Sequence, residues 1–252
     1  MSYNATKQHI RNVLSGKIQI RNGEPIQTIA CFLRSSQKAN RISESEQQIK
    51  KQVTYLSLSM SGKNLFIICG CNGAGKTTAS FNILPDLLNC KEFVNADEIA
   101  RGLSPFQPEA VAIEAGRIML NRIDELLESG LNFSFETTLS TRSFVKTIEK
   151  AKTKGYFVTL IYFWLESTDL AKDRVKKRVQ EGGHSISNET IERRYKGGIR
   201  NLFHLYLNRV DYLLIFDNSI SDSELIAEKE LNNDFTILNF EKFNQIKSMA
   251  NE

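Results

Sequence analysis

The chain has 252 residues, of which 41% are hydrophobic and 25% are charged, enough to bury one substantial α/β core plus a small additional segment. No stretch reaches the roughly 18 consecutive apolar residues of a membrane-spanning helix, and the first residues lack the apolar run of a signal peptide. We therefore expect a cytoplasmic protein. The four cysteines show no second pair or histidine cluster at zinc-ligand spacing, so we interpret them as reduced thiols.

The first sixty residues form a basic leader. They carry nine Lys and Arg against three Glu, a balance of +6, whereas the whole chain has a formal net charge of +4. Apolar residues three and four apart predict short amphipathic helices at residues 5–14, 25–40 and 43–55. We therefore divide the chain into a helical N-terminal extension, residues 1–60, and a main domain, residues 61–252.

From residue 64 onward, short apolar runs alternate with longer helical patterns, as βαβ units in a parallel sheet do. The predicted strands are residues 64–69, 92–94, 132–135, 157–165, 212–216 and 235–238. The predicted helices are residues 76–88, 108–128, 143–154, 169–180, 188–207 and 222–229. The pattern indicates an α/β fold with a parallel sheet flanked by helices.

Residues 70–77 read Gly-Cys-Asn-Gly-Ala-Gly-Lys-Thr and match the Walker A pattern of a P-loop, between an apolar strand and a helix. Glycines in this loop allow successive backbone N–H groups to point at phosphates, and the helix N-terminus adds positive charge. We expect Lys76 to bridge the β- and γ-phosphates of ATP and the Thr77 hydroxyl to ligate Mg²⁺. The predicted nucleotide contacts come from Gly70, Cys71, Asn72, Gly73, Ala74, Gly75, Lys76, Thr77, Thr78 and, from a later helix, Arg174.

Two interpretations of Cys71 stay open at this point. A thiol whose pKa is lowered by the nearby helix N-terminus would be oxidisable. The alternative is a small side chain that fills space in the loop.

Two carboxylates follow predicted strands at the edge of the sheet that carries the P-loop. Asp97 lies just past residues 92–94, and Glu136 ends the strand at 132–135. A carboxylate there could orient an acceptor hydroxyl and take its proton. The alternatives are an N-cap role for Asp97 and a solvated strand-end charge for Glu136. Because no Walker B strand ending in Asp is evident, one of these two carboxylates would also support Mg²⁺.

Arginines on two consecutive helices provide candidate phosphate contacts. Arg174 and Arg178 are four residues apart on one helical face, and Gly-Gly-His at 182–184 then breaks the helix, as in a mobile basic lid. Arg193 and Arg194 follow on the next helix. Their planar guanidinium groups suit the charge of a transferring phosphoryl group. The alternative is a solvated basic helix face, with His184 as an ordinary loop residue.

Taken together, these motifs resemble the zeta-toxin family of P-loop kinases, in its chromosomal zeta-like branch. The resemblance rests on Gly-Cys-Asn-Gly-Ala-Gly-Lys-Thr-Thr at 70–78, Val-Asn-Ala-Asp-Glu-Ile-Ala-Arg-Gly-Leu-Ser-Pro at 94–105, Ala-Gly-Arg at 115–117, Phe-Glu-Thr-Thr-Leu-Ser at 135–140, Arg-Val-x-x-Arg-Val-x-x-Gly-Gly-His at 174–184, Arg-Arg-Tyr at 193–195 and Asp-Asn-Ser at 217–219. It implies a fold like that of nucleoside monophosphate kinases. It further implies phosphorylation of a UDP-activated amino sugar such as UDP-N-acetylglucosamine, which would poison cell-wall synthesis.

The resemblance also assigns roles to the site residues. It implies that Asp97 is the general base, that Glu136 is associated with the acceptor and Mg²⁺, and that Arg178 with Arg193 or Arg194 clamps the γ-phosphate. Well-studied toxins have an Asp-x-Asp-x-aromatic-Arg sequence where this chain has Asn-Ala-Asp-Glu-Ile-Ala-Arg at 95–101. This departure leaves the identity of the acceptor open.

Three hypotheses follow. The first is an ATP-dependent sugar-nucleotide kinase that acts as the toxin of a toxin–antitoxin pair, and the second is a non-toxic small-molecule kinase with another acceptor. The third is a nucleotide-responsive ATPase whose basic leader binds nucleic acid, although the leader lacks interleaved aromatic residues and a helix-turn-helix. Family members are held inactive by a small helical antitoxin near the ATP site. The leader could do the same in cis or could simply buttress the sheet.

Overall fold

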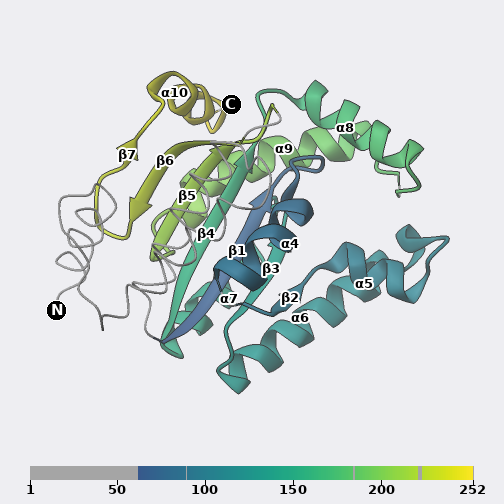
Figure 1. Cartoon of the computed structure of the whole chain (residues 1–252), viewed down its shortest axis with the longest axis horizontal. Coiled ribbons are helices and arrows are strands. Elements are labelled where there is room, and N and C mark those ends of the chain that lie inside the picture. Colours follow the sequence, from purple (N-terminus) through teal and green to yellow (C-terminus); the bar gives the residue numbers. More distant parts are fainter. Residues whose placement is uncertain (1–61, 89, 184, 221–222, 252) are drawn as a thin grey trace, which may run out of the picture.

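A mixed sheet with helices on both faces forms the centre of the computed structural model, which describes residues 62–88, 90–183, 185–220 and 223–251 (Figure 1). The described strands are β1 (Lys63–Gly70), β2 (Glu92–Val94), β3 (Phe133–Thr137), β4 (Tyr156–Trp164), β5 (Tyr212–Asp217), β6 (Glu224–Glu230) and β7 (Thr236–Ile237). They lie in the order β2-β3-β1-β4-β5-β6-β7. The first five are parallel, and β6 and β7 add an antiparallel edge. The predicted fold class is confirmed.

The helices largely follow the predicted positions. They are α4 (Lys76–Leu87), α5 (Ala96–Leu103), the 3₁₀ turn η1 (Pro108–Val111), α6 (Ala112–Ser129), α7 (Phe144–Thr153), α8 (Thr168–Gln180), α9 (Asn188–Asn201), the π-helical turn η2 (Leu202–Tyr206) and α10 (Phe240–Met249). In Figure 1, α4 lies in front of the sheet and α9 behind it. The predicted helix at 188–207 is therefore an α-helix that continues into one π-helical turn, where Leu207 N donates to the carbonyl of Leu202.

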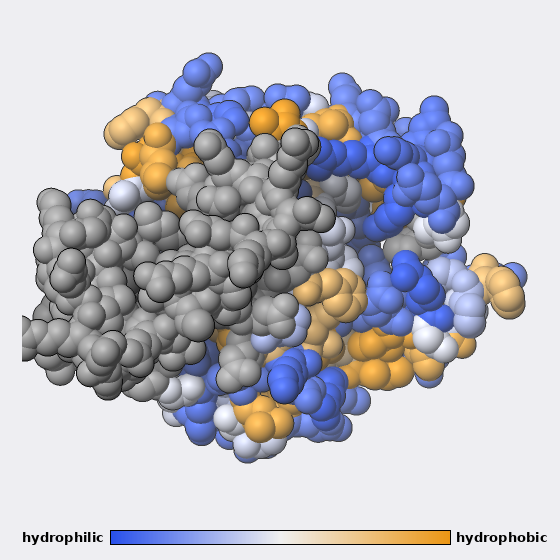
Figure 2. Space-filling model, viewed as in Figure 1, coloured by the Kyte–Doolittle hydropathy of each residue, from blue (hydrophilic) through white to orange (hydrophobic). Residues whose placement is uncertain are grey.

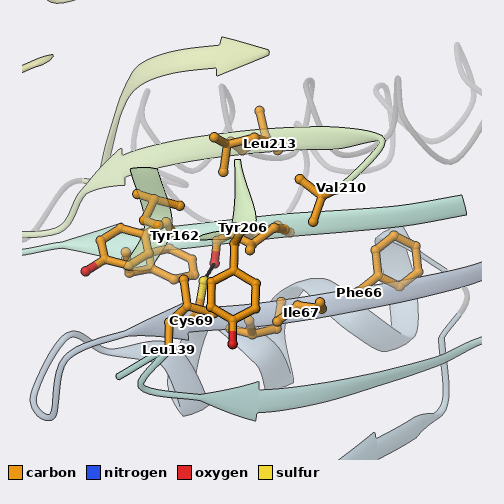
Figure 3. Packing of buried hydrophobic residues seen from close by; sticks show 14 of the residues in the cluster. Phe66, Ile67, Cys69, Leu139, Tyr162, Tyr206, Val210 and Leu213 are labelled. Carbon is orange, nitrogen blue, oxygen red and sulfur yellow. Dashed lines mark hydrogen bonds between the residues drawn. The ribbon is translucent and has the colours of Figure 1, made fainter. Parts of the chain in front are cut away.

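The central strand β1 is buried on both faces, which explains its uninterrupted apolar sequence. It pairs with β3 on one side and with β4 on the other. Figure 3 shows Tyr206, the last residue of η2, packed beside Ile67 and Cys69 of β1, with Leu139 next to them. This packing fixes the carboxyl end of β1, where the phosphate loop begins.

The prediction of a helix at 222–229 is wrong, because this segment forms β6, antiparallel to β5. Glu, Leu, Ala and Lys favour a helix locally, but Leu225, Ile226 and Ala227 are consecutive buried residues that are covered on both faces of the sheet. The predicted strand at 235–238 is reduced to Thr236–Ile237. Helices α5 and α10 were not among the predicted helices; α10 packs on β6 and α9.

The predicted leader helices of residues 1–60 and His184 lie outside the described residues, so the proposed boundary at residue 60 stays a prediction. Across the part of the chain that the structure describes, every helix is too short or too polar to cross a membrane.

Helix α10 should contribute directly to stability. Ile246 is fully buried between α10 and the sheet, so Ile246→Ala should lower the free energy of unfolding by about 2–5 kcal/mol through lost burial and a new cavity. Phe240 on the same helix is 66% exposed, and Phe240→Ala should change that free energy by less than about 0.5 kcal/mol. Urea unfolding followed by circular dichroism measures both. Equal effects of the two variants would show that α10 is not docked as described.

Candidate active site

The phosphate loop has the backbone shape that its glycines predicted. The φ angles of Gly70, Gly73 and Gly75 are 144°, 81° and 78°, in the region that favours glycine. A Cβ at Gly70 would lie 2.2 Å from the carbonyl oxygen of Phe163, and one at Gly75 would lie 2.5 Å from Nδ2 of Asn218. The loop therefore needs glycine at these positions both for its conformation and for its close packing.

The segment that follows β5, which begins at Asn218, is hydrogen-bonded to the phosphate loop. Asn218 Nδ2 donates to the carbonyl oxygen of Ala74 at 2.7 Å. Arg174 donates through Nη1 and Nη2 to the carbonyl oxygens of Asn218 and Ser219, each at 2.8 Å. Arg174 thus ties α8 to this segment, and its predicted contact with ATP stays a prediction. The Asp-Asn-Ser motif at 217–219 is evident in the sequence, but its role as a support is not.

The carboxylate of Glu136, at the end of β3, is where the site residues converge. Thr77 Oγ1 donates to Oε2 at 2.7 Å, and Asn95 Nδ2 donates to the same oxygen at 2.9 Å. Lys76 Nζ lies 3.4 Å from Oε1 and donates to the carbonyl of Cys71 at 2.9 Å. The side chains of Lys76 and Glu136 are 7% and 9% exposed, so the alternative of a solvated strand-end charge for Glu136 is wrong.

This donor set fits Mg²⁺ bound together with phosphates. The Thr77 hydroxyl and the Glu136 carboxylate are oxygen ligands, which Mg²⁺ prefers. Among the described residues, no three His, Cys, Asp or Glu side chains gather into a metal cluster. Mg²⁺ usually keeps several waters and binds through one or two protein groups plus substrate phosphates, so two protein ligands are sufficient.

Asp97 lies in the first turn of α5, next to this group. Asn95 is the N-cap of α5, and its Oδ1 accepts from the backbone N–H of Asp97 at 2.8 Å. The alternative of an N-cap role for Asp97 is therefore wrong. The carboxylate of Asp97 also acts on Arg194 of α9: burial lowers the pKa of that guanidinium, and the negative charge of Asp97 opposes this effect. The structure thus places the candidate base close to a candidate phosphate ligand.

The structure places the other predicted arginines in different environments. Arg194 Nη1 donates to Oδ1 of Asn72 in the phosphate loop at 3.1 Å, whereas Arg193 is exposed. Arg178 is partly buried, and among the described residues neither its Nε nor its Nη2 has a hydrogen-bond partner. Buried N–H groups without a hydrogen-bond partner are unfavourable, so an anionic oxygen would suit this position. Thr78 is exposed on the first turn of α4.

Figure 2 shows that the surface is hollowed between the hydrophilic side chains of α8 and those of α5. The segment after β3 is held in a strained conformation. Leu139 is fully buried with φ of 60°, an unusual value for a bulky residue. Asn201 of α9 donates to its carbonyl oxygen at 2.9 Å, and a Cβ at Gly198 would lie 2.7 Å from the carbonyl oxygen of Thr138. Helix α9 therefore packs tightly against the segment that follows Glu136, a contact that sequence analysis missed.

The three described cysteines, Cys69, Cys71 and Cys90, are free thiols, as predicted for them. Cys71 is 3% exposed, and burial raises its pKa from the ordinary 9.0 to about 11, although the charge of Lys76 acts in the opposite direction. The hypothesis of an oxidisable Cys71 with a lowered pKa is therefore wrong. Cys71 is a space-filling residue of the loop.

Cys71 should consequently resist alkylation in the folded protein. With a pKa of about 11 rather than 9.0, its thiolate fraction at pH 8 is about 100-fold lower than that of a free thiol. Iodoacetamide labelling followed by peptide mass spectrometry should show slow modification of Cys71 in buffer and rapid modification in urea. Because its pKa is higher in the folded state, folding stability should fall as the pH rises from 9 toward 11. Rapid labelling of native Cys71 at pH 8 would contradict the described burial.

Comparisons with known proteins agree with this geometry. The zeta toxin family model matches residues 47–224. An uncharacterized protein of Haemophilus influenzae is 33% identical over 137 residues, which cover 54% of this chain and 94% of that protein.

Two solved structures share the fold. The AvrRxo1-ORF1:AvrRxo1-ORF2 complex with sulphate ions aligns with a TM-score of 0.62 at 16% identity, over 92% of this chain and 80% of that chain. The PezAT chromosomal toxin–antitoxin system of Streptococcus pneumoniae aligns with a TM-score of 0.52 at 16% identity, over 92% and 97%. The family match spans well over half of the chain, so the chain belongs to the zeta toxin family and is a P-loop kinase.

Proposed function

We propose that the chain transfers the γ-phosphoryl group of ATP to a hydroxyl of a UDP-activated amino sugar such as UDP-N-acetylglucosamine. The observation that carries the phosphoryl-transfer part of the proposal is the convergence of Lys76 and Thr77 on Glu136, with Asp97 held beside it through Asn95. The UDP-amino sugar is the acceptor that the family resemblance implies. Membership of the zeta toxin family supports a phosphotransferase. A structure of AvrRxo1-ORF1:-ORF2 with ATP, similar to this chain with a TM-score of 0.61 at 16% identity over 82% and 72% of the two chains, is consistent with ATP as the donor.

The phosphate loop binds the donor. Its backbone N–H groups and the N-terminus of α4 receive the phosphates, and Lys76 exchanges its contacts with Cys71 and Glu136 for phosphate oxygens. Thr77 and Glu136 would hold Mg²⁺, which neutralises charge on the β- and γ-phosphates when bound. These groups are already within hydrogen-bond reach of one another, so binding requires an exchange of partners and no large rearrangement.

Asp97 acts as the general base in the transfer. Its carboxylate orients the acceptor hydroxyl and takes its proton as the hydroxyl oxygen forms a bond to the γ-phosphorus. The bond between that phosphorus and the bridging oxygen breaks, and the electron pair leaves with ADP. Arg178 and Arg194 stabilise charge on the equatorial oxygens, consistent with the unpartnered Nε and Nη2 of Arg178 and the contact of Arg194 with Asn72.

We further propose that the chain acts in the cytoplasm as a toxin restrained by a protein partner. The structural similarity to a toxin–antitoxin system supports an antitoxin that covers the ATP site. Residues 1–60 are the alternative cover, since tethering would give them an effective concentration of about millimolar.

A panel of acceptors tests the function. The protein, ATP and Mg²⁺ are incubated with UDP-sugars, nucleotides and free sugars, and phosphorylated products are detected by mass spectrometry. We expect phosphate on a UDP-amino sugar. Lys76→Ala should abolish transfer, and Asp97→Asn should lower kcat by about 10²–10⁴-fold, because it keeps the shape of the side chain but removes the base.

Three outcomes would contradict parts of the proposal. Phosphate on a free sugar or a nucleotide would favour the non-toxic kinase. Full activity of Lys76→Ala would exclude the phosphate loop from catalysis. A kcat of Asp97→Asn within about tenfold of wild type, about 1.4 kcal/mol of barrier, would exclude Asp97 as the base.

The two adjacent arginines provide a matched pair. Arg194→Ala should lower kcat by about 10²–10³-fold with a smaller effect on the KM for ATP, because its charge acts on the transition state. Arg193 is exposed, and Arg193→Ala should leave kcat within about twofold of wild type. Arg178→Ala should resemble Arg194→Ala. Steady-state kinetics at saturating acceptor separate these effects, and equal losses in Arg193→Ala and Arg194→Ala would argue for a general electrostatic role of the helix.

A further inference from the structure

Asn95 connects the two carboxylates of the site. It follows β2 directly, is 6% exposed, and uses both ends of its amide. Oδ1 accepts from the backbone N–H of Asp97 at 2.8 Å, and Nδ2 donates to Oε2 of Glu136 at 2.9 Å. The backbone N–H can only donate, so the amide atom facing it is the oxygen, and the other end must be the NH₂ group that faces the carboxylate.

The geometry of α5 makes this contact important. Within this helix of eight residues, which the structure describes in full, Ala100 is the buried residue. Ala96 and Ile99 pack against the core while remaining only partly buried, and the cap at Asn95 adds a directional hydrogen bond at the first turn. The same side chain reaches across to the end of β3, so the position of Asp97 is set relative to Glu136.

We propose that Asn95 is a positioning residue for phosphoryl transfer, which holds the base Asp97 and the metal-associated carboxylate Glu136 in a fixed relation through one amide. This inference rests on the proposed function. Asn95 touches neither the phosphates nor the acceptor in this role; it acts through the two carboxylate residues. Partners that orient metal ligands in this way typically change metal affinity or activity by about 10–100-fold when they are removed.

In this chain the amide of Asn95 makes two contacts of opposite kind, which a carboxylate could not make. Aspartate at position 95 would still accept from the N–H of Asp97 and cap α5, but it would have no hydrogen to donate to Glu136. Two carboxylates at this separation repel each other unless a cation lies between them. The substitution therefore keeps the cap, removes the link to Glu136 and adds a second negative oxygen donor to the metal site.

The test compares three variants. Asn95→Asp keeps the cap and loses the donor, and Asn95→Ala loses both. The control is Asn239→Asp, because Asn239 caps α10 with the same pattern: Oδ1 accepts from the backbone N–H of Lys242 at 3.1 Å, and Nδ2 donates to Glu224 Oε1 at 2.8 Å. Glu224 lies outside the candidate site, so Asn239→Asp makes the same chemical change without altering the contacts of Glu136.

Two readouts are measured. Calorimetric titration of each protein with ADP at a series of Mg²⁺ concentrations gives the Mg²⁺ dependence of nucleotide binding without turnover. Steady-state kinetics give kcat and KM. We expect Asn95→Asp to reach half-maximal ADP binding at a Mg²⁺ concentration lower by about tenfold and both Asn95 variants to lose about 10–100-fold in kcat, with the KM for ATP within about threefold of wild type. Asn239→Asp should change neither readout.

Several results would overturn the inference. An unchanged Mg²⁺ dependence of ADP binding in Asn95→Asp would overturn it. This measurement needs no acceptor, so its outcome can be told apart from a failure of the proposed function. A wild-type kcat in both Asn95 variants, or the same losses in Asn239→Asp, would also overturn it. If Asn95→Ala does not fold, Asn95→Asp alone decides, because it retains the cap.

Discussion

One buried carboxylate organises the site. A charged carboxylate removed from water is strongly unfavourable unless donors surround it, and Glu136 is 9% exposed. Its donors come from two segments: Lys76 and Thr77 at the start of α4, where the phosphate loop ends, and Asn95 between β2 and α5. Satisfying this one charge therefore brings the loop, β3 and the start of α5 to fixed positions. The groups that stabilise Glu136 in the free protein are the groups proposed to hold phosphate and Mg²⁺, so the site is organised before the nucleotide binds.

A second set of contacts holds the phosphate loop from the side of β5. Asn218 donates to the loop carbonyl at Ala74, and Arg174 donates to the carbonyls of Asn218 and Ser219. The two arginines of α8 therefore have different environments, although their spacing in the sequence places them on the same face of the helix. Arg174 has hydrogen-bonded protein partners, whereas two nitrogens of Arg178 have none among the described residues. An arginine already bound to backbone carbonyls supports structure, and one whose nitrogens are unpaired suits a developing negative charge.

The features that could be read from the sequence are those with a local signal. The phosphate loop combines a short motif with the strand before it and the helix after it, and the central strands are continuous apolar runs. The segment 222–229 has local helical propensity, but pairing with β5 decides its structure. Asn218 and Asn95 were missed because their partners Ala74 and Glu136 lie 144 and 41 residues away in the chain. The sequence could predict that one of Arg193 and Arg194 faces the site, because adjacent helical residues point about 100° apart, but not which one.

The same geometry explains why the chemistry is easier to infer than the acceptor. The groups proposed to handle phosphate lie on β3, α4, α8 and α9, each of which contributes buried residues to the hydrophobic core that holds it in place. Asp97, in contrast, begins a helix that buries only Ala100 of its eight residues and continues toward the exposed side chains of Leu103 and Phe106. Residues on such a surface can change with little effect on stability. An acceptor that approaches Asp97 from this side would be selected by side chains that the fold does not constrain, while Asp97, the proposed base, is held by its hydrogen bond to Asn95.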